Sequence, residues 1–127
     1  MRLLILLTLI LSCTKKEHKI SKEELLSMGE KVSADISLVV PTGIATKLVD
    51  CSLYRPKCLV GYRVKIKLLE FNALMYDNKA DALLSAQTFE GYYSHNWSFD
   101  YVVGEPILER FVKKAYDAKK VTSEVSL

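Results

Sequence analysis

Two cysteines, Cys51 and Cys58, are the residues of this sequence whose chemistry is best defined by their spacing. They enclose the segment Ser-Leu-Tyr-Arg-Pro-Lys, in which a proline helps the chain to fold back. The gap is wider than that of a CxxC redox motif, and no histidine lies nearby to complete a zinc site. The spacing therefore favours a structural disulfide, which contributes about 2.5 kcal/mol in the chain-entropy model. A metal site and a redox pair are the alternatives.

Catalytic residue types are sparse, because the sequence contains only two histidines. A hydrolytic site could combine a histidine with a carboxylate and a serine. No strained nucleophile turn such as GxSxG surrounds the serines near the second histidine, and adjacent residues of a strand point to opposite faces. A non-catalytic histidine is therefore favoured, and a small extracytoplasmic hydrolase is the alternative. The residues that it would use are His95, Asp100 or Glu105, and Ser94 or Ser98.

The sequence contains no glycine-rich phosphate loop, no HExxH motif and no EF-hand loop. We therefore expect neither a metal site nor a cofactor.

The loop between the cysteines is a candidate binding surface, through Tyr54, Arg55 and Lys57. Tyrosine and arginine are enriched at interface hot spots, and a disulfide at the base of a loop lowers the entropy cost of binding. The alternative is a solvated connection between two elements.

An aromatic cluster near the second histidine offers another candidate surface. Tyr92 and Tyr93 follow the predicted end of a helix and could contact a protein partner or stack on the sugar rings of a cell-wall glycan. Alternation along the next strand instead directs Trp97, Phe99 and Tyr101 into the core.

The N-terminus has the order of an export signal. Arg2 precedes an apolar run over residues 3–11, and the small residue Ser12 precedes Cys13. A helix of this length rises about 14 Å, whereas the hydrocarbon core of a bilayer is about 30 Å thick. This segment is therefore too short to span a membrane.

The tetrapeptide Ile-Leu-Ser-Cys that ends at Cys13 resembles the lipobox of bacterial lipoproteins. The resemblance implies cleavage before Cys13, and then a diacylglyceryl group and usually an N-acyl chain, such as palmitate, on that cysteine. Two or three chains anchor a protein stably. Because Thr14 is not aspartate, the resemblance also implies an outer-membrane anchor with the protein facing the periplasm.

Composition limits the remaining function classes. The chain has 18 Lys and Arg against 15 Asp and Glu, and removal of Arg2 leaves a net charge near +2. Readers of nucleic acid usually carry a concentrated basic face, so we expect no nucleic-acid partner. The expected organisation is a signal peptide at 1–12, a lipidated tether at 13–20, one domain at 21–120 and a disordered tail at 121–127.

Period-two patterns predict the strands. Apolar and polar residues alternate over residues 59–68, which predicts a half-buried strand with a basic outer face. Residues 71–76 predict a second strand after a reversal at residues 69–70, with one long bent strand as the alternative. Residues 36–40 could form a strand or extend a helix, and their length favours a strand. Residues 97–102 predict another strand.

Helical periodicity and capping residues predict the helices. Ser21 and Glu24 form a capping-box pattern, Asn78 is a second N-cap, and Pro106 suits the first turn of the last helix. Gly91 is expected to end the middle helix in the left-handed conformation. The predicted helices run from residue 21 to residues 32–34, over 45–51, over 79–90, and from residue 106 onward.

These elements predict an α+β fold, in which a small antiparallel sheet has helices packed on one face. A strand at 36–40 followed by a helix at 45–51 would give the ferredoxin-like order βαββαβ. The resulting hypothesis is a membrane-anchored envelope lipoprotein that acts as a non-enzymatic binding or structural module, with an envelope protein or cell-wall glycan as partner.

Overall fold

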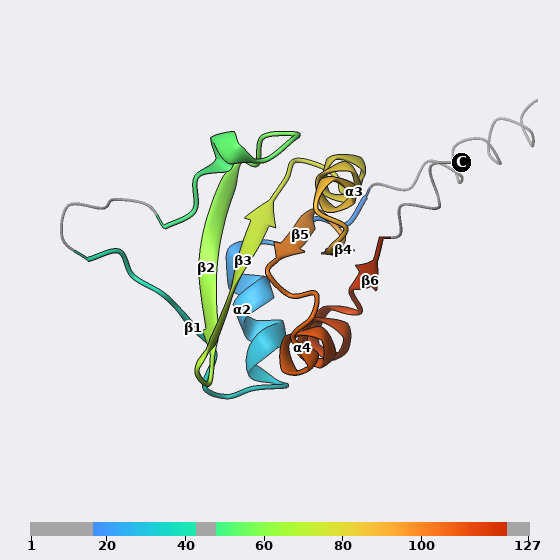
Figure 1. Ribbon diagram of the computed structural model, residues 1–127. Coiled ribbons are helices and arrows are strands. Elements are labelled where there is room, and N and C mark those ends of the chain that lie inside the picture. Colours follow the sequence, from blue (N-terminus) through green and yellow to red (C-terminus); the bar gives the residue numbers. More distant parts are fainter. Residues whose placement is uncertain (1–16, 43–47, 122–127) are drawn as a thin grey trace, which may run out of the picture.

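An antiparallel sheet organises the part of the chain that the computed structural model describes, which is residues 17–42 and 48–121. Its six strands lie in the order β1-β2-β3-β5-β4-β6, and all neighbouring pairs are antiparallel (Figure 1). The predicted α+β class with an antiparallel sheet is therefore confirmed. The strands are β1 (Ser37–Leu38), β2 (Val60–Ile66), β3 (Leu69–Met75), β4 (Tyr92–Ser94), β5 (Trp97–Asp100) and β6 (Lys119–Lys120).

The two longest strands of this sheet, β2 and β3, form a hairpin. Ile66 pairs with Leu69, so the chain reverses at Lys67 and Leu68 rather than at the predicted residues 69–70. Lys67 has a positive φ of 56°, and its N–H donates to the Asp35 carboxylate at 2.9 Å. A contact from a distant loop therefore stabilises a turn that lacks the usual Gly or Asn.

A second hairpin joins β4 and β5 and was not predicted. Its reversal at His95 and Asn96 gives His95 a positive φ of 52°. The strand β5 ends at Asp100, earlier than the predicted residue 102, because Tyr101 takes the left-handed conformation with φ 66°. Short strands of this kind give too few alternations to be recognised by period.

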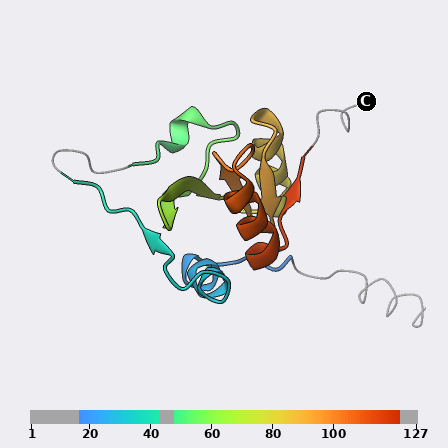
Figure 2. The same cartoon turned by 60° about the horizontal axis from the view of Figure 1, so that its bottom comes forward.

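Helices α2 (Lys22–Glu30) and α4 (Pro106–Tyr116) pack against each other and against one face of the sheet (Figures 1 and 2). The predicted capping box of α2 is present, since Ser21 Oγ accepts from Glu24 N–H and Glu24 reaches back to the Ser21 N–H. The helix ends at Glu30, slightly before the predicted residues 32–34. Pro106 stands in the first turn of α4, as predicted.

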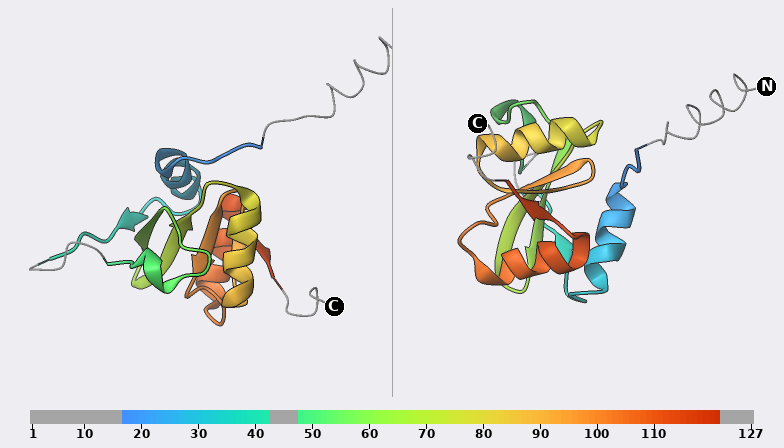
Figure 3. Two further views of the ribbon diagram at one scale, coloured as in Figure 1. Left: turned by 90° about the horizontal axis from the view of Figure 1, so that it is seen from above. Right: turned by 90° about the vertical axis from the view of Figure 1, so that its right-hand side faces the viewer.

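Helix α3 (Lys79–Thr88) packs against β4 and β5, and Figure 3 shows it set apart from the pair of α2 and α4. Its Ser85 accepts a hydrogen bond from Ser98 of β5, whereas the β5 neighbours of Ser98, Trp97 and Phe99, face the α2 and α4 side. Helix α3 therefore covers the opposite face. The sequence patterns had predicted helices on one face of the sheet. The structure places α2 and α4 on one face and α3 on the other.

The end of α3 also differs from the prediction. Glu90, not Gly91, adopts the left-handed conformation, with φ 51°. Gly91 is needed for a close approach, because a Cβ there would lie 2.3 Å from the Phe89 ring and 3.0 Å from the Phe99 carbonyl oxygen. A glycine is therefore needed at this position because neighbouring atoms lie too close for a side chain, and not because the backbone is left-handed.

Between β1 and β2 the chain does not form the predicted helix over residues 45–51. Residues 45–47 lie outside the described residues, residues 48–50 are not helical, and a 3-10 turn, η1 (Cys51–Leu53), follows them. Because β1 pairs directly with β2, the strand order is also not ferredoxin-like. The prediction of a strand at residues 36–40 is confirmed, in the short form of β1.

Two buried clusters lie on the two faces of the sheet. The larger one, between the sheet and the α2–α4 pair, includes Trp97, Phe99, Phe111 and Tyr116. The smaller one lies beneath α3 and the loop that contains η1. Its buried members are Val49, Cys58, Leu74, Tyr76 and Ala82.

The residues just before α2 belong to the packed structure, although residues 13–20 were expected to be a tether. Ile20 is buried, and its N–H donates to Asn96 Oδ1 at 2.7 Å. Lys19 pairs with Asp77 at 3.1 Å. At the other end, Val121 is also buried, and its N–H donates to the Gly91 carbonyl. Within the described ranges, no helix combines the length and apolarity that a membrane span requires.

Candidate functional site

The loop between β1 and β2 is fixed to the sheet by covalent and polar contacts. Cys51 and Cys58 form a disulfide, with their Cα atoms 5.0 Å apart. Asp50 accepts from the Ser52 N–H at 3.0 Å and from its hydroxyl at 2.6 Å, which caps η1. The Tyr76 hydroxyl donates to the Pro56 carbonyl oxygen at 2.8 Å. The disulfide loop, residues 51–58, is therefore held in one position on the sheet.

A row of polar side chains crosses three neighbouring strands beside this loop. Arg63 lies opposite Asn72 in the register of β2 and β3, and Asn72 lies opposite Asp100 in the register of β3 and β5. Arg63 Nε donates to Asn72 Oδ1 at 3.2 Å. We call Arg63, Asn72 and Asp100 the polar row. Directly opposed residues on one face of a sheet lie close enough to interact, which explains the row.

Tyr54 connects the disulfide loop to the polar row. Its hydroxyl donates to Asp100 Oδ2 at 2.6 Å and accepts from Asn72 Nδ2 at 3.1 Å. Burial raises the pKa of the Tyr54 hydroxyl above its usual value, and the hydrogen bond to Asp100 raises it further. Tyr54 is therefore a neutral donor at physiological pH and holds the loop against the sheet.

A groove of about 490 Å³ opens between the disulfide loop and the polar row. Its walls combine apolar groups with charged groups of both signs, which are Arg55, Arg63, Asp50 and Asp100. Leu53, Phe89 and Tyr101 are among the apolar and aromatic lining residues. Arg55 is exposed, and Tyr101 has 66% of its surface exposed. We call this the row groove. Two of the predicted binding residues, Tyr54 and Arg55, thus line one concave surface.

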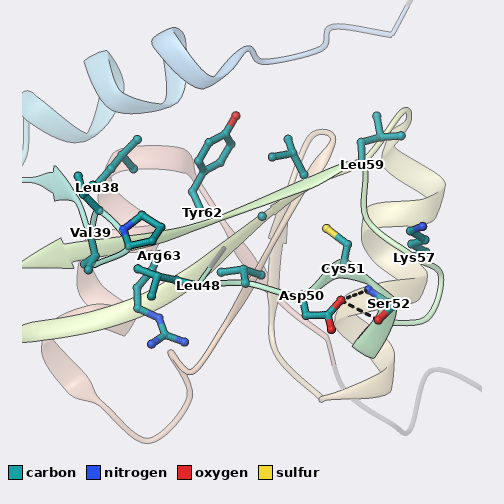
Figure 4. Close-up of a pocket in the computed structure, with 15 residues that line it drawn as sticks. Leu38, Val39, Leu48, Asp50, Cys51, Ser52, Lys57, Leu59, Tyr62 and Arg63 are labelled. Atoms are coloured by element: carbon teal, nitrogen blue, oxygen red, sulfur yellow. Dashed lines mark hydrogen bonds between the residues drawn. The ribbon is translucent and has the colours of Figure 1, made fainter. Parts of the chain in front are cut away.

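A second groove, of about 530 Å³, adjoins the first along the outer edge of β2. Figure 4 shows that Tyr62 points toward α2 while Arg63 points to the other side of the strand. The third predicted loop residue, Lys57, lines this edge groove together with Leu59. The two grooves share the lining residues Leu48, Val49, Asp50 and Arg63, so they form one continuous surface.

The predicted aromatic surface at Tyr92 and Tyr93 is placed elsewhere. Tyr92 is buried, and its hydroxyl donates to Glu109 of α4 at 2.8 Å. Burial of the hydroxyl raises the pKa of Tyr92 to about 12, and the hydrogen bond to Glu109 is the second cause of the shift. Tyr93 is half-buried and pairs with Ser98. Neither residue lines the two grooves.

The residues of the alternative hydrolase are not assembled into one site. Asp100 ends β5, whereas His95 lies in the hairpin turn before that strand begins, and the three residue steps of β5 alone span about 10 Å at ~3.3 Å per residue. Glu105 stands at the start of α4. Ser94 is buried, contacts His95 Nδ1 at 3.1 Å and donates its proton to the Tyr116 carbonyl at 2.5 Å.

The other candidate nucleophile, Ser98, is fully buried against Ser85. Neither serine is therefore accessible to a substrate.

The core assignment of the next aromatic residues is confirmed for Trp97 and Phe99, which are both buried. It is wrong for Tyr101, because the left-handed backbone at this residue ends the alternation of β5. Tyr101 therefore faces the row groove instead of the core.

Sequence reasoning missed the polar row itself. The alternation of β2 identifies Arg63 only as part of a basic outer face. Asn72 is a polar residue within an apolar predicted strand, and its partners cannot be seen from that strand alone. Asn72 is buried, and a polar residue at such a position requires partners. The sequence signal for the polar row is Asn72, a single polar residue in an apolar strand that pairs with Arg63 of the neighbouring strand.

Comparisons with known proteins give no match from which a function of this site could be inferred. No protein-family model matches the chain. No curated protein matches it, and no solved structure matches it. In the part of the chain that the structure describes, no three His, Cys, Asp or Glu side chains are grouped so that they could hold a metal ion.

We expect reduction of the disulfide to lower the free energy of unfolding by about 2.5 kcal/mol, because the loop closed by Cys51 and Cys58 is short. The large cluster on the other face contains neither cysteine, so the fold should persist. Urea unfolding with and without reductant measures the difference. Alkylation without reductant, followed by mass spectrometry, should leave both thiols unmodified, and two labelled thiols would contradict the pairing.

Proposed function

We propose that this protein is a lipid-anchored, extracytoplasmic binding module whose binding surface is the row groove. The anchor is proposed at Cys13, from the resemblance of residues 10–13 to a lipobox. Exported proteins commonly carry disulfides, so the bond between Cys51 and Cys58 supports a location outside the cytoplasm.

The observation that carries the binding proposal is the pre-organised contact of Tyr54 with Asn72 and Asp100. These hydrogen bonds, at 3.1 and 2.6 Å, join a disulfide-closed loop to a rigid sheet. A binding surface that is ordered before its partner arrives loses little conformational entropy on binding. The loop then presents Arg55 and Leu53 at the rim of a concave surface.

The chemistry of the groove favours a protein segment that carries a carboxylate. Both carboxylate oxygens of Asp100 already accept hydrogen bonds, from Tyr54 and from the Tyr101 N–H. Arg63 uses its Nε toward Asn72 and lies 3.9 Å from a Glu70 carboxylate oxygen, whereas Arg55 is exposed and has no ion pair among the described residues. Guanidinium groups bind carboxylates in bidentate geometry, so Arg55 is the group of the groove that favours an acidic partner.

The anchor is tested by replacing Cys13 with serine. We expect Cys13→Ser to abolish incorporation of a clickable palmitate analogue and retention in the membrane fraction, because the acylated side chain is removed. Labelling followed by fractionation measures both. Equal labelling of the wild type and the variant would contradict anchoring at this residue. The result is independent of the binding surface.

The binding surface is tested by a photo-crosslinking amino acid at Leu53, which lines the row groove and is 78% exposed. The matched control position is Leu84 of α3, which is 51% exposed and lies outside both grooves. We expect adducts from Leu53 only, on peptides with Asp or Glu beside the linked residue. Arg55→Ala should reduce them about tenfold, the equivalent of one charge-assisted hydrogen bond.

An arginine control separates the groove from surface charge in general. Arg110 is exposed on α4, and Arg110→Ala should leave the adducts unchanged. Equal yields from Leu53 and Leu84, or equal loss with both arginine variants, would contradict the row groove. Adducts on cell-wall glycan fragments instead of peptides would replace the protein partner with a glycan.

A further inference from the structure

The edge groove contains a stretch of β2 whose outer side is not paired. In an antiparallel sheet, successive residues direct their N–H and C=O groups alternately to the two neighbouring strands. The bond from the Val39 N–H to the Arg63 carbonyl, at 2.9 Å, shows that odd-numbered residues of β2 face outward. Within residues 17–42 and 48–121, this ladder ends at Arg63, and Gly61 has no backbone partner on its outer side.

Strand β1, if continued in its own register, would lack a donor at Gly61. Leu38 pairs with Val64, so three further residues of the same register would place Pro41 opposite Gly61. Proline has no N–H and cannot donate to the Gly61 carbonyl. The strand β1 therefore cannot supply a donor to the Gly61 carbonyl, and among the described residues the Gly61 N–H also has no backbone partner.

The groove beside this edge has fixed walls. Val49 packs directly on Gly61, where a Cβ would lie 2.3 Å from Val49 Cγ1. The disulfide and the cap at Asp50 hold the following residues in place. The opposite wall is formed by Leu38 to Pro41, as Figure 4 shows for Leu38 and Val39. Leu59, at one end, is 62% exposed, so it offers apolar surface to an occupant.

The opposite edge of the sheet, at β6, is protected against the addition of a further strand. Strand β6 consists of two lysines, Lys119 and Lys120, and both are exposed. Charged residues, lysine above all, discourage the addition of a further strand to a sheet edge. At the other edge, Gly61 itself carries no charged side chain.

We infer that the outer edge of β2 at residues 60–62 accepts an extended, acidic peptide of a partner protein as an added strand. The N–H and C=O of Gly61, which have no backbone partner among the described residues, can pair with an extended polypeptide that supplies complementary backbone groups. Arg63 and Lys57 line the groove with one carboxylate, Asp50, so the cationic groups are in excess and acidic side chains are favoured. This inference rests on the proposed function, because the edge groove and the row groove form one surface.

Peptide selection on the purified full chain tests this inference. A displayed library of random dodecapeptides should yield sequences in which β-branched and acidic residues alternate. A selected peptide, once synthesised, should lose about fivefold in affinity when alternate backbone amides are N-methylated in the register that faces Gly61, since the lost backbone bond costs about 1 kcal/mol. Unchanged affinity after N-methylation in both registers would overturn strand addition while leaving binding through side chains possible.

A matched pair of variants locates the peptide. Leu59→Glu places an acid in the edge groove and should weaken binding at least about tenfold, since like charges repel. Leu68→Glu is the control, because Leu68 is 90% exposed in the turn between β2 and β3, outside the groove. Equal effects of the two variants, or a selection that enriches no peptide, would overturn the inference.

Amide exchange gives a readout that does not depend on side chains. The Gly61 N–H should exchange rapidly in the free protein and become protected when the peptide binds, whereas the Tyr62 N–H, which faces β3, should be protected in both states. Protection of Gly61 in the free protein, or none in the complex, would contradict an open edge.

Discussion

Asn96→Ala is expected to lower the free energy of unfolding by about 2–4 kcal/mol and to detach residues 17–20 from the sheet. The side chain is buried and bonds three backbone groups, which are the Ile20 N–H at 2.7 Å, the Ile20 carbonyl at 3.4 Å and the Tyr76 carbonyl at 3.2 Å. Alanine would leave a buried N–H and a buried carbonyl without partners, and each costs about 1–3 kcal/mol. Urea unfolding and amide exchange at Ile20 measure the two effects.

Asn78→Ala is the matched control for this change. Asn78 caps α3, and its side chain accepts from the Asp81 N–H at 2.8 Å. Loss of such a cap costs about 1 kcal/mol and should leave the Ile20 amide protected. An Asn96→Ala protein that retains protection at Ile20 would show that the hydrogen bond from Trp97 Nε1 to the Ile20 carbonyl, at 2.7 Å, is sufficient for the attachment.

The attachment of Ile20 also bears on the proposed anchor. Only four peptide steps separate Cys13 from Glu17, the first residue that the structure describes. Four steps reach at most about 14 Å. A lipid on Cys13 would therefore hold the domain close to the bilayer, with Glu17 to Ile20 bound to the sheet between β4, β5 and α3.

The elements that follow from local pattern were predictable. The alternation over residues 59–68 identified β2 because one face of that strand is buried in the large cluster. The capping box at Ser21 and the proline at residue 106 located the starts of α2 and α4, since both signals act through the backbone of the first turn. The spacing of Cys51 and Cys58 predicted their disulfide for the same reason: the interaction is local in sequence.

The features that were missed depend on residues that are distant in sequence. The turn at Lys67 is stabilised by Asp35, which lies 32 residues earlier in the chain. The polar row needs the register of three strands, which no single strand specifies. The candidate site was therefore only half predictable: Tyr54 and Arg55 followed from the loop, whereas Asn72 and Asp100 followed from the sheet.

Four tyrosines make the protein sensitive to alkaline pH, and we expect it to unfold as the pH rises through 10 to 12. Burial raises the pKa of Tyr54, Tyr76 and Tyr116, and it raises the pKa of Tyr92 to about 12. The unfolded chain loses these protons near pH 10. Their contribution is fully present below pH 10 and is lost as the pH rises through the folded pKa, by up to about 1.4 kcal/mol per tyrosine and pH unit.

Tyr116→Phe distinguishes this cause from other alkaline effects. In the part of the chain that the structure describes, the Tyr116 hydroxyl is the one buried side-chain polar atom without a hydrogen-bond partner. Its removal should leave the stability at pH 7 unchanged or raise it by about 1 kcal/mol, and should shift alkaline unfolding to higher pH.

Tyr76→Phe is the contrasting variant, because its hydroxyl donates to the Pro56 carbonyl and contacts Ser85 at 2.6 Å. It should also lose one alkaline-sensitive proton, but at a cost of about 1–3 kcal/mol at pH 7, since buried partners lose their hydrogen bond. Absorbance at the tyrosinate band, recorded with circular dichroism during a pH titration, follows ionisation and unfolding together. Ionisation of all tyrosines near pH 10 with no loss of structure would contradict the burial of these hydroxyls as the cause.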